Sequence, residues 1–93
     1  MGLKALKPDM IQAYFDFSNA VDKTENLPRK EKELIAVGVA HAIQCQFCID
    51  DHVKKARAAG AGDEEIAEAI IVAAKVRAGS TLTYGKYYAF KKE

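Results

Sequence analysis

Two cysteines and one histidine carry the clearest potential for chemistry in this sequence. Cys45, Cys48 and His52 follow one another at C-x-x-C-x-x-x-H spacing, and the chain has no other cysteine. On a helix, residues three or four positions apart share a face, so all three side chains would line one side of the same turns. A thiol reacts as its thiolate, which a helix start or a neighbouring imidazolium stabilises. The spacing therefore predicts thiol–disulfide chemistry.

A carboxylate is the candidate partner of the histidine. Glu33 lies twelve residues before Cys45, ahead of a long uncharged run. If the chain reverses near residues 41–44, Glu33 comes to lie opposite His52, where a carboxylate would fix the imidazole tautomer and raise its basicity. If the helix is continuous, Glu33 is about 18 Å from Cys45, and only a second protomer brings it close. Both geometries stay open, because the reversal would lack the usual Gly or Pro.

The same residues allow other interpretations. His41, Cys45, Cys48 and His52 could supply a Cys₂His₂ zinc site, although ordinary zinc patterns separate the two ligand pairs by a dozen or more residues. The cysteines could also be buried, inert thiols, in a module that only assembles with other copies. Haem attachment is excluded because Ile49, not His, follows the second cysteine. Two thiolates are too few for an ordinary iron–sulfur cluster.

Length and charge narrow the class of protein. The 93 residues are 49% hydrophobic and predict one domain, residues 1–93. A chain of this size buries a thin core, so association between copies would add much stability. With 14 basic and 13 acidic residues and no basic stripe interleaved with aromatics, no nucleic-acid partner is expected. Lys91 and Lys92 are interpreted as a solvated chain end.

The sequence also bears on location. No segment reaches the ~18 uncharged apolar residues that a membrane span requires, and residues 1–7 lack the apolar region of a secretory signal. We therefore expect a cytoplasmic protein with no membrane partner. In that compartment a C-x-x-C pair is more often catalytic or metal-binding than a permanent cross-link.

Helices are predicted throughout, because no strand-length run alternates apolar and polar residues. A first helix should begin at Pro8 and fade near residues 23–26. A second should begin at Pro28, and its nearly uncharged body over residues 34–43 is typical of a helix buried in a core or an interface. The stripe that the first helix should present consists of Met10, Tyr14, Phe17 and Val21, widened by Ile11 and Phe15.

The second half of the chain should continue in the same way. A third helix is expected from about Cys45 to Ala59, with Gly60 just after its end. Asp63 is the expected N-cap of an alanine-rich helix that lets its neighbours approach closely. A last segment after Gly79 holds an aromatic cluster that should pack in a core or an interface, made of Tyr84, Tyr87, Tyr88 and Phe90.

These residues carry a family resemblance. Over roughly residues 8–90, the chain resembles the carboxymuconolactone decarboxylase family, and within it the alkylhydroperoxidase D-like branch. The E-x11-C-x2-C-x3-H pattern is specific. The positions that carry the resemblance are Glu33, the run Cys45-Gln46-Phe47-Cys48-Ile49-Asp50-Asp51-His52, Lys54, Ala56, Ala59-Gly60-Ala61 and Glu64-Glu65-Ile66.

The resemblance implies an all-α bundle of about five helices, intertwined in a homo-oligomer that is a trimer or a hexamer. It implies that Cys48 is the attacking thiolate and Cys45 the resolving partner, with His52 and Glu33 as the proton relay. No cofactor is implied. The implied partners are a small disulfide or hydroperoxide substrate and an external thiol or protein reductant.

One position departs from the family pattern. Alkylhydroperoxidase D has a histidine between its cysteines, where this chain has Phe47. Disulfide exchange is therefore expected ahead of peroxide reduction. Members that decarboxylate a lactone generally lack the cysteine pair, which makes that activity the weaker alternative.

Overall fold

The chain is built from helices, as the sequence predicts. The computed structural model describes residues 2–23 and 25–90, and these residues contain no strand. Lys91 and Lys92, interpreted above as a solvated end, lie outside the described residues. The elements are α1 (Leu3–Leu6), α2 (Pro8–Lys23), α3 (Arg29–Ala42), α4 (Gln46–Ala58), α5 (Asp63–Tyr84) and a π-helical turn over Gly85–Ala89.

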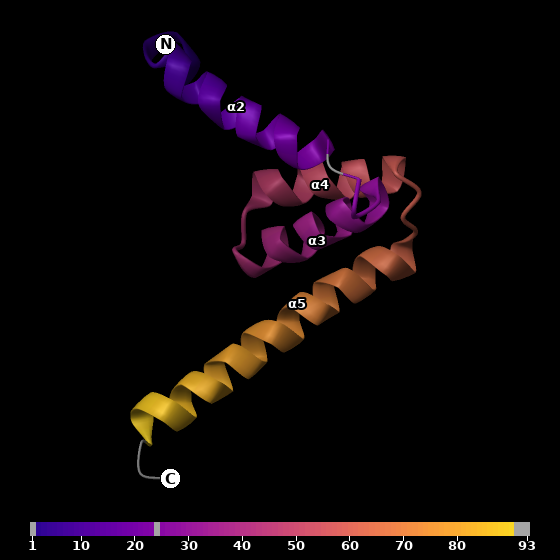
Figure 1. Ribbon diagram of the computed structural model, residues 1–93. Coiled ribbons are helices and arrows are strands. Elements are labelled where there is room, and N and C mark those ends of the chain that lie inside the picture. Colours follow the sequence, from indigo (N-terminus) through magenta and orange to yellow (C-terminus); the bar gives the residue numbers. More distant parts are fainter. Residues whose placement is uncertain (1, 24, 91–93) are drawn as a thin grey trace.

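The helices form a small centre with two long projections. α3 and α4 lie side by side, and α5 packs against α3 (Figure 1). α2 and the second half of α5 extend away from this centre toward the two chain ends (Figure 1). Among the described helices, none has the length and apolar character needed to cross a membrane.

The core lies where α3, α4 and α5 meet. Val37 of α3, Ala56 of α4 and Ile66 of α5 are buried together with Ala61. Three partly buried side chains pack around them: Leu34, Val53 and Ile70. The central residues are all small or β-branched, so the helices approach closely without a large buried volume. This small core holds the α3–α4 pair in place.

The chain reverses between α3 and α4 without Gly or Pro. Gln44 takes the left-handed conformation with φ 57°, which only a minority of non-glycine residues adopt. The Cys45 N–H donates to the Ala40 carbonyl at 3.0 Å, and the Gln44 N–H donates to the His41 carbonyl at 3.1 Å. These two bonds form a Schellman motif, which satisfies the last carbonyls of α3. The reversal, one of the two geometries that the sequence allowed, is therefore the correct one.

The predicted helix starts need small corrections. The short α1 precedes the helix expected at Pro8, and Pro28 is the N-cap of α3 rather than its first residue. Gly62, not Asp63, is the N-cap of α5. The Gly62 N–H donates to the Glu65 carboxylate at 3.1 Å, so a side chain three positions into the helix satisfies the terminal backbone group.

The end of the chain differs more from the prediction. α5 continues through Gly79 to Tyr84 instead of ending there, because one glycine costs a helix interior only about 1 kcal/mol. The aromatic residues after Gly79 do not reach the core of their own chain: Tyr84, Tyr87, Tyr88 and Phe90 are all exposed. Tyr84 and Tyr88 stack on each other, with ring centroids 4.5 Å apart. Packing of this cluster in the core of its own chain is thus wrong, and packing in an interface stays a prediction.

Larger side chains at Gly38 and at Gly79 should change the stability of the protein in opposite directions. A Cβ at Gly38 would lie 3.2 Å from the Ala69 carbonyl oxygen of α5, whereas a Cβ at Gly79 meets nothing within 4 Å. We expect Gly38→Leu to lower the free energy of unfolding by about 1–3 kcal/mol, because the side chain pushes α5 off α3. Gly79→Ala should raise it by about 0.5–1 kcal/mol. Urea unfolding at one fixed protein concentration measures both, and a Gly38→Leu protein as stable as wild type would contradict the packing.

Candidate functional site

The two cysteines lie at the start of α4. Cys45 is the N-cap of that helix, and its Sγ accepts a hydrogen bond from the Cys48 N–H at 3.2 Å. The two sulfurs form a disulfide, with the Cα atoms 5.2 Å apart. A helix that begins near Cys45, as the sequence predicts, would have both sulfurs in its first turn. Only Cys45 Sγ receives a terminal backbone N–H, because the N-cap position directs its side chain back onto the helix.

Glu33 and His52 meet across the α3–α4 pair. His52 Nδ1 lies 2.8 Å from Glu33 Oε1, which is the contact that the reversal predicts. An ionised carboxylate only accepts hydrogen bonds, so Nδ1 carries the proton and donates it. In a neutral imidazole with this tautomer, Nε2 is the nitrogen that accepts a hydrogen bond or a proton. The arrangement of carboxylate and imidazole follows the logic of a catalytic triad.

Arg29 holds the far side of the same carboxylate. Arg29 Nε lies 3.2 Å from Glu33 Oε2, one helical turn away on α3. Glu33 is only 4% exposed and is the buried charged residue among the described ones. A buried carboxylate needs a compensating charge and hydrogen bonds, and Arg29 and His52 together provide both. Each oxygen of Glu33 therefore has its own partner.

A second carboxylate lies on the exposed side of His52. Asp51 Oδ2 is 3.9 Å from His52 Nε2 and 2.9 Å from Lys55 Nζ. The hydrogen bond from Lys55 lowers the pKa of Asp51 below its usual value, and the same bond raises the pKa of Lys55. Asp51 thus stays ionised beside the imidazole at neutral pH.

The Asp51–Lys55 pair predicts a pH-dependent contribution to stability. The pKa of Asp51 is lowered in the folded chain, so its contribution is complete above the unfolded pKa of about 3.9 and is lost as the pH falls through the folded value. Because the pair is exposed, Asp51→Asn should lower the free energy of unfolding at pH 7 by less than about 1 kcal/mol. Urea unfolding of both proteins between about pH 7 and pH 3 checks this. A difference that stays constant or grows below about pH 4 would contradict it.

His41 does not join the cysteines. Its Nδ1 donates to the Val37 carbonyl at 2.8 Å, one turn back on α3. The alternative zinc set of His41, Cys45, Cys48 and His52 is not assembled, since both sulfurs are in the disulfide. Within residues 2–23 and 25–90, no three His, Cys, Asp or Glu side chains are grouped as metal ligands.

Sequence reasoning missed the two bases beside the site. Arg29 and Lys55 each lie four positions from a carboxylate, Glu33 and Asp51 respectively. That i, i+4 spacing is a readable signal for an ion pair on a helix. The signal is weak, because charged residues at the ends of helices are common and mostly solvated.

Comparison with known proteins shows the family of this chain. The profile of the carboxymuconolactone decarboxylase family matches residues 8–86. The chain belongs to this family. The matched segment includes the whole of α2, α3, α4 and α5, and with them every residue of the site.

Two relatives from the comparisons agree with that assignment. A crystal structure of a protein from Methanobacterium thermoautotrophicum superimposes with a TM-score of 0.85 at 33% identity, covering 90% of this chain and 94% of the other. A Paracoccus denitrificans protein named "Uncharacterized protein 4 in cox locus" is 47% identical over 72 residues, or 77% of this chain. The chain spans 65% of that relative's length. The two relatives agree with the family and the fold, while neither relative's name specifies an activity.

Proposed function

We propose that this member of the carboxymuconolactone decarboxylase family is a thiol–disulfide oxidoreductase that cycles Cys45 and Cys48 between dithiol and disulfide. The observation that carries the proposal is the disulfide at the α4 N-terminus one helical turn before His52, whose tautomer Glu33 holds. A helix start stabilises a thiolate, and an oriented imidazole supplies or removes protons. These are the two requirements of reversible disulfide exchange.

The reaction with a disulfide substrate takes two exchange steps. Cys48 first passes its thiol proton to His52, and the resulting thiolate attacks one sulfur of R–S–S–R. A Cys48–S–S–R mixed disulfide forms, and the released thiolate takes that proton from His52. Cys45 then loses its proton to His52 and attacks Cys48 Sγ. The second thiolate leaves and takes this proton from His52, and the Cys45–Cys48 disulfide forms. Two electrons pass from the protein to the substrate, and two R–SH molecules are the product.

A hydroperoxide is the alternative oxidant for the same pair. The Cys48 thiolate attacks the terminal oxygen of R–O–O–H, which breaks the O–O bond and leaves a Cys48 sulfenic acid and R–OH once a proton is delivered. Cys45 condenses with the sulfenic acid, releasing water and forming the same disulfide. Because Phe47 stands where alkylhydroperoxidase D has histidine, disulfides are proposed ahead of hydroperoxides.

The hydrogen bond from the Cys48 N–H to Cys45 Sγ favours Cys45 as the leaving sulfur when the disulfide is reduced. An external thiol or protein reductant opens the bridge by attacking Cys48 Sγ, and Cys45 leaves as a thiolate. The Cys48 N–H already lies 3.2 Å from Cys45 Sγ and stabilises the negative charge on the departing sulfur. A leaving thiolate that is stabilised in this way departs faster. A second thiol of the reductant then attacks the mixed disulfide between the reductant and Cys48, which releases the reduced protein.

A turnover assay tests the proposal. We expect the wild-type protein to accelerate dithiothreitol-dependent reduction of 2-hydroxyethyl disulfide, with cumene hydroperoxide as a slower or equal second substrate. The double variant Cys45→Ser/Cys48→Ser is the matched control and should give the uncatalysed rate. Equal rates for wild type and double variant on both substrates would overturn the proposal. Lactone decarboxylation that survives in the double variant would point to the weaker alternative instead.

Arg29 should act on this cycle through Glu33. We expect Arg29→Met to lower kcat about 10-fold or more, because Glu33 then loses the partner of one oxygen and orients His52 less well. Arg29→Lys should recover part of the loss, since it restores the charge but not the planar guanidinium. The pH profile of kcat separates this role from a structural one: it should shift in Arg29→Met and return in Arg29→Lys. An unshifted profile in both would contradict positioning by Arg29.

A further inference from the structure

Two ionisable side chains lie one helical turn beyond Cys48 on the same face of α4. His52 follows Cys48 by four positions and Asp51 follows it by three, and both spacings keep side chains on one face of a helix. The side chains of His52 and Asp51 are 31% and 37% exposed, so a small molecule can reach both. The surface next to the attacking sulfur therefore combines an imidazole with a carboxylate.

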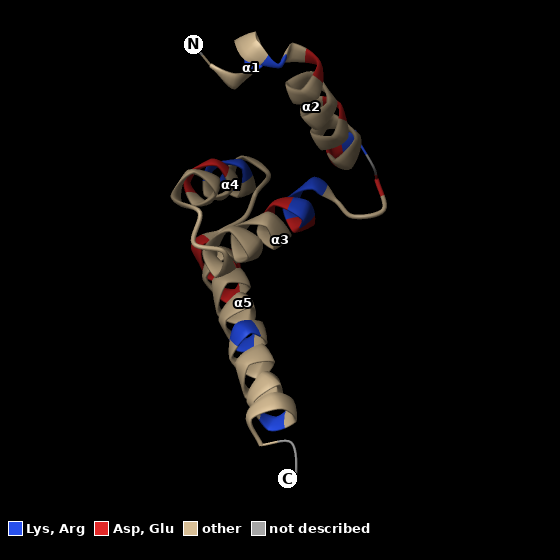
Figure 2. Ribbon diagram, turned by 90° about the vertical axis from the view of Figure 1, so that its left-hand side faces the viewer, with Lys and Arg blue, Asp and Glu red and all other residues tan. Residues whose placement is uncertain are grey.

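The Asp51 carboxylate can accept a further cation. Its side-chain contacts within residues 2–23 and 25–90 all go to Oδ2, which lies 2.9 Å from Lys55 Nζ and 3.9 Å from His52 Nε2. Figure 2 shows the acidic part of the α4 ribbon next to its basic part. An ionised carboxylate offers about four lone-pair sites, and an exposed ion pair is weak enough for a second cation to share its carboxylate. Asp51 thus keeps acceptor sites for a bound molecule.

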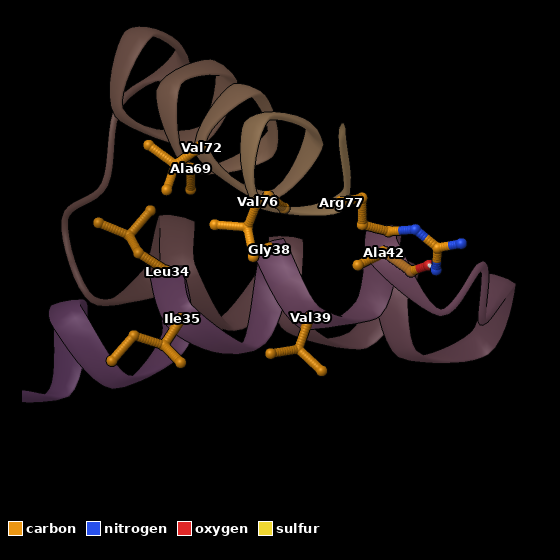
Figure 3. A pocket seen from close by; sticks show the side chains of 10 residues that line it. Leu34, Ile35, Gly38, Val39, Ala42, Ala69, Val72, Val76 and Arg77 are labelled. Carbon is orange, nitrogen blue, oxygen red and sulfur yellow. Dashed lines mark hydrogen bonds between the residues drawn. The ribbon is translucent and has the colours of Figure 1, made fainter. Parts of the chain in front are cut away.

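The other charges around the cysteines are placed differently. Glu33 is buried, and both of its oxygens already have partners. The Arg77 guanidinium donates to a backbone carbonyl of α3 between α3 and α5 (Figure 3), and α3 separates α5 from α4 (Figure 1). Asp50 is two positions from Cys48, a spacing that directs side chains to different faces. Asp51 is therefore the acidic side chain that shares an exposed face with the attacking sulfur.

The distances fit a disulfide that has an ammonium group two carbons from sulfur. In S–CH₂–CH₂–NH₃⁺, three single bonds join sulfur to nitrogen, and the three bonds between consecutive Cα atoms span about 3.8 Å. His52 Nε2 and Asp51 Oδ2 are 3.9 Å apart. A substrate sulfur that takes its proton from Nε2 can therefore hold its ammonium group against the carboxylate. The residues before Cys48 on α4, Gln46 and Phe47, are uncharged and would not repel that ammonium.

We propose that the Cys45–Cys48 site selects cationic disulfides of the aminothiol type, with Asp51 binding the ammonium group. The inference rests on the proposed disulfide exchange and names its substrate class. With cystamine, the reduced protein breaks the substrate S–S bond and forms its own, and two cysteamine molecules leave with the two electrons and two thiol protons of the protein. Disulfides that carry carboxylates are disfavoured, because their charge is repelled by Asp51.

Rates of oxidation of the reduced protein test the role of Asp51. Second-order rate constants are measured for cystamine and for neutral 2-hydroxyethyl disulfide by acid quenching and mass spectrometry, without added reductant. The ratio of the two constants should fall about threefold to fivefold in Asp51→Asn, which is what one exposed ion pair contributes. Each disulfide keeps its intrinsic reactivity in every assay, so the change in the ratio between proteins reports the charge. With 3,3′-dithiodipropionate in place of cystamine, the ratio should rise.

Asp50→Asn is the matched control. It removes the same charge from the neighbouring position on another face of α4, and at about 0.15 M salt the ratio should stay near the wild-type value because charges at a distance are screened. A ratio that is unchanged in Asp51→Asn, or that falls equally in Asp50→Asn, would overturn the inference and leave the disulfide exchange intact. A reduced protein that none of the three disulfides oxidises would overturn the proposed function and the inference together.

A non-reacting analogue tests binding without exchange. 1,6-Diaminohexane has CH₂–CH₂ where cystamine has S–S, so it carries the same two ammonium groups and cannot be reduced. At constant ionic strength it should slow the oxidation of wild type by cystamine, and it should slow Asp51→Asn about threefold to fivefold less effectively. The neutral analogue 1,6-hexanediol should have little effect on either protein. Equal inhibition of both proteins by the diamine would contradict binding of the ammonium group at Asp51.

Discussion

Cys48→Ser should abolish turnover, whereas Cys45→Ser, in the absence of added thiol, should give a protein that reacts once and stops. Without Cys48 the proposed attacking thiolate is missing and Cys45 alone cannot complete the cycle, so the rate should fall to the uncatalysed value. Without Cys45 the mixed disulfide on Cys48 has no resolving partner, so one equivalent of R–SH is released and the protein gains the mass of one R–S group. Stopped-flow measurement of the released thiol and intact-protein mass spectrometry check both results.

The comparison of the two serine variants carries its own control. Serine is nearly isosteric with cysteine at either position, and each variant removes the same disulfide, so a general loss of stability would affect both proteins alike. The prediction is asymmetric, and the N-cap position of Cys45 is one physical reason for it. A mixed disulfide that accumulates on Cys45 in Cys48→Ser, and none on Cys48 in Cys45→Ser, would reverse the assignment of attacking and leaving sulfur.

Glu33→Gln should cost about 10²–10⁴ in kcat, which is the range that positioned acid–base catalysis contributes. Glutamine keeps the shape of the side chain but lacks the charge, so it holds the imidazole tautomer less well and no longer forms the ion pair with Arg29. His52→Gln should lose a similar factor. Because the two residues act as one unit, the double variant should be little slower than either single variant.

Two further measurements are controls for the predicted loss of kcat in Glu33→Gln. Glu65→Gln removes an exposed carboxylate from α5 that pairs with Lys30, away from the cysteines, and should leave kcat within about twofold of wild type. Alkylation of the reduced protein with iodoacetamide shows whether Cys48 is still accessible in Glu33→Gln. Losses that multiply in the double variant, rather than overlap, would mean that Glu33 and His52 do not act together.

The sequence predicted the contact that matters most for the site. Glu33 and His52 are equally far from the middle of residues 41–44, so a reversal there had to bring them together, and the 2.8 Å contact is present. What the sequence left open was the reversal itself. Gln44 adopts a conformation that glycine usually provides, and two Schellman bonds of α3 stabilise it. Those bonds depend on the packing of α4 against α3, which local residue preferences do not encode.

The parts that the sequence predicted less well depend on contacts across helices. Arg29 became part of the site only because the fold buries Glu33 and leaves one of its oxygens facing back along α3. α5 passes through Gly79 because the helix is long enough to absorb the cost of one glycine. The aromatic cluster after Gly79 has the composition of a core, and the chain alone offers it no core to join. Composition gives the tendency to be buried but not the partner.

A single-turnover thiol count measures most directly whether the two sulfurs exchange two electrons with a substrate. The protein is reduced, freed of reductant and mixed with one equivalent of 2-hydroxyethyl disulfide, and thiols are then counted by alkylation and mass spectrometry. We predict that both protein thiols disappear, two equivalents of 2-mercaptoethanol are released, and the product peptide contains Cys45 joined to Cys48. Two thiols that persist unchanged over hours, with no 2-mercaptoethanol released, would contradict the proposed redox cycle.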